Sequence, residues 1–138
     1  MLEKANILII EDDPDMQDVL STILAPAAYE LTSCYTGPDG MAAARKRKPD
    51  LILLDIMLSS PSEGFHLAYE LKQDEVLKEV PVIMISSIGK TMGLDYAKEL
   101  GSDYVQAERF LDKPFDAKTL RDTVTEVLAE AAAKKESS

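Results

Sequence analysis

Apolar runs and amphipathic stretches alternate along this chain. Five short stretches predict strands, at Ala5–Ile10, Glu30–Cys34, Leu51–Leu54, Val82–Ile85 and Arg109–Leu111. The run Leu51–Leu54 contains no polar residue, which is typical of a strand buried on both faces of a parallel sheet. Strands that alternate with helices of about ten residues form βαβ units. We therefore expect a doubly wound α/β fold of the (βα)5 type, with a five-stranded parallel sheet.

The helices are predicted from the spacing of apolar residues. In the first, Asp13 is a suitable N-cap and Pro14 a suitable first residue. Its apolar stripe is Met16, Val19, Leu20, Ile23 and Leu24. The other helices are predicted at Pro38–Lys48, Phe65–Gln73, Met92–Leu100 and Asp116–Lys134. One domain is expected over residues 1–130, and the tail 131–138 is expected to fray because its apolar stripe ends.

The composition of the chain disfavours several classes of protein function. A length of 138 residues suits a single domain with a proper core. The net charge of −10 disfavours binding to nucleic acid or to an anionic membrane, since both need clustered Lys and Arg. No apolar run approaches the roughly 18 residues of a transmembrane helix, and no signal peptide is evident. The single cysteine, Cys34, is expected to be a small core residue of a cytoplasmic protein.

Acidic residues collect where the predicted strands end. Glu11 and Asp12 follow the first strand, and Asp55 follows the third. Carboxyl ends of parallel strands share one edge of the sheet, where a carboxylate cluster is costly unless a cation neutralises it. Magnesium suits such oxygen ligands, so the sequence predicts a magnesium site. Asp13 and Asp15 are assigned instead to the helix start, where carboxylates accept from free N–H groups.

Two further strand ends add a hydroxyl and an ammonium group. Ser86 follows the fourth strand and Lys113 follows the fifth. A metal ion, a nucleophilic carboxylate and a lysine are what phosphoryl transfer to an aspartate requires. His66, the only histidine, is expected to be a surface or packing residue rather than a phosphodonor.

Four segments of the chain resemble the receiver domain of two-component response regulators, which has a CheY-like, flavodoxin-like fold. They are Ile7–Pro14, Asp50–Leu58, Pro81–Ser87 and Phe110–Phe115. The acidic pair, the strand-end aspartate and the Lys-Pro dipeptide, in this order, form a specific set. The resemblance extends over about residues 5 to 130.

The resemblance implies a phosphorylation site at Asp55. The phosphoryl group would come from a sensor histidine kinase or a histidine phosphotransfer protein. Mg²⁺ would be bound by Asp12, Asp55 and the backbone carbonyl of Met57, with Glu11 acting mainly through water. Lys113 would pair with the phosphoryl oxygens. Such a protein is not an enzyme, although it assists its own phosphorylation and dephosphorylation.

The resemblance also implies a switch. The hydroxyl of Ser86 would be drawn to the phosphoryl group, and Phe110 would swing inward. This movement would alter a face that binds a downstream protein target.

The chain departs from the family pattern in three places. The loop Ile56–Gly64 looks one residue longer than usual, and Tyr104–Glu108 looks like an insertion beside the face that receivers offer to partners. Phe110 lacks the hydroxyl of the commoner Tyr. Met57 and Ile88 are apolar where receivers flank the path of the hydrolytic water. This predicts slow self-dephosphorylation, although the two side chains could simply cover the loop.

Other functions remain as alternatives. A haloacid-dehalogenase-like phosphatase would need a second aspartate at position 57, where the chain has Met57. A flavodoxin-like flavin binder would need a phosphate loop in place of the acidic residues after the first strand. A receiver-like interaction module that works without phosphorylation is the main alternative. No output domain follows within 138 residues, so the chain acts alone or is part of a larger regulator. The cognate kinase, the target and the oligomeric state stay open.

Overall fold

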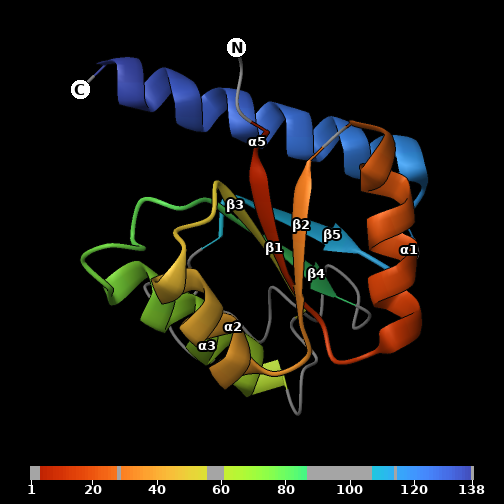
Figure 1. Cartoon of the computed structure of the whole chain (residues 1–138), viewed down its shortest axis with the longest axis horizontal. Helices are drawn as coiled ribbons and strands as arrows, with labels where there is room; N and C mark the ends of the chain where they lie inside the picture. Colours follow the sequence, from red (N-terminus) through yellow and green to blue (C-terminus); the bar gives the residue numbers. More distant parts are fainter. Residues whose placement is uncertain (1–3, 28, 56–60, 87–106, 114, 138) are drawn as a thin grey trace.

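The computed structural model describes residues 4–27, 29–55, 61–86, 107–113 and 115–137. Five parallel strands form one sheet in the order β2-β1-β3-β4-β5 (Figure 1). The strands are β1 (Asn6–Ile10), β2 (Glu30–Cys34), β3 (Leu51–Asp55), β4 (Val82–Ser86) and β5 (Arg109–Asp112). The predicted parallel sheet is therefore confirmed, and each strand begins and ends within one residue of its expected bounds.

Helices cover both faces of the sheet. They are α1 (Pro14–Leu24), the short 3₁₀ helix Ala25–Ala27, α2 (Gly37–Lys46), α3 (Pro61–Gln73) and α5 (Ala117–Ser137). Figure 1 shows α2 and α3 on one face of the sheet and α1 and α5 on the other. The two-sided covering is that of a doubly wound fold, as the alternation of strands and helices predicted.

The strand residues divide between two cores because successive side chains of a strand point to opposite faces. Leu8 and Ile10 belong to the core that includes α2 and α3, whereas Ile7 and Ile9 belong to the core that includes α1 and α5. All five residues of β1 and all five of β3 are buried. This two-sided burial explains why the run Leu51–Leu54 has no polar residue.

Helix α1 begins as predicted, and most of its predicted apolar stripe faces the core. Asp13 is its N-cap, and the side chain accepts a hydrogen bond from the N–H of Asp15 at 2.9 Å. Its buried residues are Gln17, Leu20 and Leu24. The expectation that Val19 belongs to the core stripe is wrong, since Val19 is 45% exposed. Met16 and Ile23 do pack against this core, and the buried face is shifted from Val19 toward Gln17.

The other helices differ from their predicted ranges mainly at their ends. Helix α2 ends at Lys46, and α3 begins at Pro61, so part of the expected long loop is helical. Helix α5 continues to Ser137. Helical geometry thus extends through most of the tail, and its fraying stays a prediction. The predicted helix Met92–Leu100 lies outside the described residues.

One close approach fixes α2 against the sheet. A Cβ atom at Gly40 would lie 2.7 Å from Cγ1 of Ile10, so the helix backbone packs directly on β1. Cys34 is half-buried and packs against the same core, as expected for a small core residue. Within the described residues, no helix combines the length and the apolar character needed to cross a membrane.

Candidate functional site

The register of the sheet brings the predicted polar residues to one edge. Ile10 is paired with Leu54, so the next residues along the two chains, Glu11 and Asp55, lie side by side. Asp55 is paired with Ile85 on the other side. Carboxyl ends of parallel strands are where open α/β folds place their sites.

Three carboxylates form a cluster at this edge. Glu11, Asp12 and Asp55 each offer an oxygen atom, and these three atoms lie within 4.8 Å of one another. Glu11 is 1% exposed and Asp55 is 3% exposed, whereas Asp12 is exposed. The cluster therefore has two buried carboxylates and a third that is accessible from solvent.

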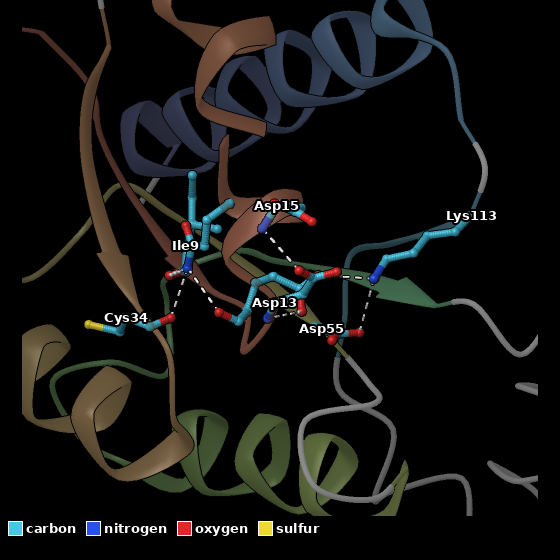
Figure 2. Close-up of polar contacts among 8 residues, drawn as sticks. Ile9, Asp13, Asp15, Cys34, Asp55 and Lys113 are labelled. Atoms are coloured by element: carbon cyan, nitrogen blue, oxygen red, sulfur yellow. Dashed lines mark hydrogen bonds and ion pairs between the residues drawn. The ribbon is translucent and has the colours of Figure 1, made fainter. Parts of the chain in front are cut away.

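Lys113 supplies positive charge to the cluster. Its Nζ atom lies 2.9 Å from Oε1 of Glu11 and 3.7 Å from Oδ1 of Asp55. Figure 2 shows Lys113 reaching across from the segment after β5 toward Asp55 at the end of β3. One ammonium group therefore faces two buried carboxylates. The charges do not balance, and this edge still favours a cation.

The pKa of Glu11 reflects this excess of negative charge. Burial, together with a hydrogen bond to Asp55 and its charge, raises the pKa of Glu11 to about 8, although Lys113 acts in the opposite direction. A carboxyl group with so high a pKa is one whose ionised form lacks enough positive charge around it. A hard divalent cation would supply that charge, and carboxylate oxygens are ligands that Mg²⁺ accepts. The residues of this edge thus fit a magnesium ion.

The acidic residues of the next turn have a different role. Asp13 caps helix α1, and Asp15 lies in its first turn. Among the described residues, the only group of three or more His, Cys, Asp or Glu side chains placed to hold a metal ion is the Glu11 cluster, which includes neither. The division of the acidic residues into a helix start and a cluster agrees with the sequence prediction.

Other predicted residues are placed with less detail. Ser86 ends β4 and is paired with Asp112, so its backbone lies at the same edge. Phe110 lies on β5 and is 39% exposed. Met57, Ile88 and most of the expected insertion lie outside the described residues. His66 fits its expected surface role, because its side chain is 56% exposed and Nε2 lies 2.8 Å from Oε1 of Glu70.

Two residues with specific contacts were not singled out from the sequence. Glu108 accepts hydrogen bonds from Nζ of Lys72 at 2.7 Å and from the N–H of Val82 at 2.6 Å, which ties the start of β5 to α3 and β4. Gln17 is buried at the start of α1 and contacts the backbone beneath the acidic cluster. Its place three residues before Leu20 and seven before Leu24 was the signal that it shares their buried face.

Comparison with known proteins identifies relatives along nearly the whole chain. The family model of the response regulator receiver domain matches residues 7–125. Protein PilH of Pseudomonas aeruginosa is 32% identical over 125 residues, which cover 91% of this chain and 98% of PilH. The DNA-binding dual master transcriptional regulator RpaA of Synechocystis sp. is 35% identical over 114 residues, which cover 83% of this chain and 45% of RpaA. The chain spans nearly all of PilH but about half the length of RpaA.

Solved structures agree with this result. The receiver domain of NtrX from Brucella abortus has 31% sequence identity and a TM-score of 0.74, covering 89% of this chain and 98% of that one. A CheY-like receiver domain protein from Methanospirillum hungatei has a TM-score of 0.81 at 22% identity, covering 96% and 99% of the two chains, and supports the fold alone. With a family model over residues 7–125 and relatives above 30% identity, this chain belongs to the response regulator receiver domain family.

Proposed function

We propose that the chain is a phosphorylation switch in which Asp55 accepts a phosphoryl group from a sensor histidine kinase or a histidine phosphotransfer protein. The single observation that carries this proposal is the placement of Asp55. It is a buried carboxylate within reach of Glu11, Asp12 and Lys113, at the edge of the sheet where β3 ends. A bond forms between an Asp55 oxygen and phosphorus, the phosphorus–nitrogen bond of the donor breaks, and the electron pair stays on the imidazole.

The side chains around Asp55 would serve the transfer by charge and position. Lys113, which already lies 3.7 Å from Oδ1 of Asp55, would pair with the oxygens of the arriving group. Asp12 and Asp55, with the backbone carbonyl of Met57, would hold Mg²⁺, and Glu11 would act mainly through water. When bound, Mg²⁺ supplies positive charge that offsets the charge gathering on the phosphoryl group. The contribution of the protein would therefore be to position the reactants and the charges around them. Because the chain itself is the acceptor of the phosphoryl group, it would not be an enzyme.

The consequence of phosphorylation would be a change at β4 and β5. Ser86 would donate its hydroxyl to the phosphoryl group, and Phe110 would move inward from its exposed position. Since Phe110 has no hydroxyl, its inward state would be held by apolar burial alone. The face altered in this way would bind a downstream protein in the cytoplasm. The relative RpaA is DNA-binding, and the match with this chain covers 45% of its length. If this chain is part of a longer protein of that kind, the output of the switch would be DNA binding by a region outside the receiver domain.

The lifetime of the switch is the property in which this chain would differ. Apolar side chains at Met57 and Ile88 would not orient a water molecule for attack on the phosphoryl group. The exchange Met57→Asn with Ile88→Glu should then shorten the phosphoryl lifetime, measured by loss of label from protein in the presence of Mg²⁺. An unchanged lifetime would show that the two side chains only cover the loop.

The experiment that tests the proposed function is incubation with Mg²⁺ and acetyl phosphate, followed by intact-mass analysis. We expect the gain of one phosphoryl group on the wild-type chain and none on Asp55→Asn, nor on the wild-type chain without Mg²⁺. The exposed residue Asp18 gives the matched control, because Asp18→Asn makes the same chemical change outside the acidic cluster. No gain on the wild-type chain under any condition would favour the alternative, an interaction module that works without phosphorylation.

A further inference from the structure

Gln17 is a buried amide held by the backbone beneath the acidic cluster. It lies on α1 and is 2% exposed. Its Nε2 atom lies 2.9 Å from the carbonyl oxygen of Cys34, 3.1 Å from that of Glu11 and 3.2 Å from that of Ile9. Cys34 is the last residue of β2 and Ile9 the last but one of β1, and both are labelled in Figure 2. One side chain from the helix therefore joins both strand ends.

The contacts extend the sheet by one residue. The N–H of Glu11 donates to the carbonyl oxygen of Cys34 at 3.0 Å, so pairing between β1 and β2 continues past Ile10. Gln17 donates to this same oxygen and to the carbonyl of Glu11. Without Gln17, the carbonyl of Glu11 would need another donor at a place where α1 covers the chain. Gln17 thus holds the carbonyl of Glu11 directly, and it shares the Cys34 carbonyl with the N–H of Glu11.

The amide oxygen of Gln17 shows that the hydrogen bonds donated by its nitrogen determine how the amide is oriented. Within the part of the chain that the structure describes, Oε1 of Gln17 is buried without a hydrogen-bond partner. Rotating the amide would place that oxygen against three carbonyl oxygens. A buried acceptor left without a donor is unfavourable, and an apolar residue at this position would avoid it. A requirement for core packing alone does not explain a glutamine on the face that Leu20 and Leu24 share.

We propose that Gln17 is a positioning residue for the acidic cluster. By holding the backbone of Glu11, it directs the Glu11 carboxylate to Lys113, 2.9 Å away, and places Asp12 beside Asp55. The inference rests on the proposed function, in which these carboxylates serve phosphoryl transfer with Mg²⁺. Some residues orient metal ligands without contacting the metal themselves. Their removal typically lowers metal affinity by about 10- to 100-fold.

The test compares Gln17→Met with the wild-type chain. Methionine has a similar length and no donor, so the core volume is kept while all three bonds are lost. We expect the Mg²⁺ dissociation constant to rise about 10-fold or more, measured from the shift of amide signals during Mg²⁺ titration. We also expect faster amide hydrogen exchange at Glu11 and Asp12 in protein without Mg²⁺. Should Gln17→Met not fold, Gln17→Asn, one methylene shorter, carries the same test.

A matched variant separates positioning from loss of stability. Leu71 is fully buried on α3, in the core on the other face of the sheet. Leu71→Ala should destabilise the fold but leave the Mg²⁺ dissociation constant of the folded protein within about 2-fold of the wild-type value, because its effect is remote from the ligands. Equal weakening of Mg²⁺ binding by Leu71→Ala and Gln17→Met would overturn the proposal.

The remaining outcomes distinguish this inference from the proposed function. An unchanged dissociation constant in Gln17→Met, with normal Mg²⁺ binding and phosphorylation in the wild-type chain, would overturn only the positioning role. A wild-type chain that neither binds Mg²⁺ nor accepts a phosphoryl group would overturn the proposed function, and the positioning role with it. Weaker Mg²⁺ binding in Gln17→Met, with phosphorylation restored at high Mg²⁺ concentration, would support both.

Discussion

The stability of this fold should fall as pH rises toward 8 when no divalent cation is present. Glu11 ionises near 4.5 in an unfolded chain, and in the folded chain burial and the neighbouring Asp55 raise its pKa to about 8. Between these two values the folded state retains a proton that the unfolded state has lost. The stabilisation is therefore fully present below pH 4.5 and is lost as pH rises through about 8.

The size of the effect follows from the distance between the two pKa values. At about 1.4 kcal/mol for each pH unit, the free energy of unfolding would decrease by roughly 5 kcal/mol across the window. Since a domain of this size is stabilised by about 5 to 15 kcal/mol in total, the loss is large enough to measure.

The change Glu11→Gln isolates this contribution. It removes the titrating group while keeping the side-chain length, so the decrease in stability between about pH 5 and about pH 8 should largely vanish. Urea unfolding followed by circular dichroism at several pH values gives the free energy directly. Asp18→Asn, the same change at an exposed residue of α1, should keep the wild-type dependence on pH.

Magnesium provides a second arm of the same experiment. A cation bound at the cluster favours the ionised form of Glu11, so excess Mg²⁺ should flatten the pH dependence of the wild-type chain and raise its stability near pH 8. The effect should be smaller in Glu11→Gln, which has one carboxylate fewer. Parallel stability curves for the wild-type chain and Glu11→Gln over the whole pH range would refute the assignment of the raised pKa.

Three further substitutions test the packing around the site, each by urea unfolding at constant pH. Gly40→Ala should cost about 1 to 3 kcal/mol, because its new methyl group would crowd Ile10; a gain in stability would show that α2 can move away. Glu108→Gln should cost about 1 to 3 kcal/mol, since Lys72 loses its charged partner, and should leave phosphorylation unchanged. Asp13→Ala should cost about 0.5 to 2 kcal/mol through loss of the N-cap, and an unchanged midpoint would contradict that role.

The amino-acid sequence determined the sheet and the chemistry of its edge. Strands buried on both faces must be continuously apolar, so Leu51–Leu54 and its neighbours could be identified without any knowledge of their partners. Parallel strands also end at a common edge, and this rule alone predicted that Glu11, Asp12 and Asp55 would meet. The helix start at Asp13 was equally local, because an N-cap bonds to the backbone two residues away.

Only the tertiary structure decided which side of each helix is buried and which distant charges pair. The spacing in α1 placed Leu20 and Leu24 on the buried face, but only docking of the helix on the sheet decided that Gln17 is buried and Val19 is exposed. Contacts such as Lys72 with Glu108 and Lys113 with Glu11 join residues 36 and 102 positions apart. Such contacts depend on how layers pack, which no local pattern encodes. The raised pKa of Glu11 has the same origin, since burial and a neighbouring carboxylate exist only once the strands have assembled.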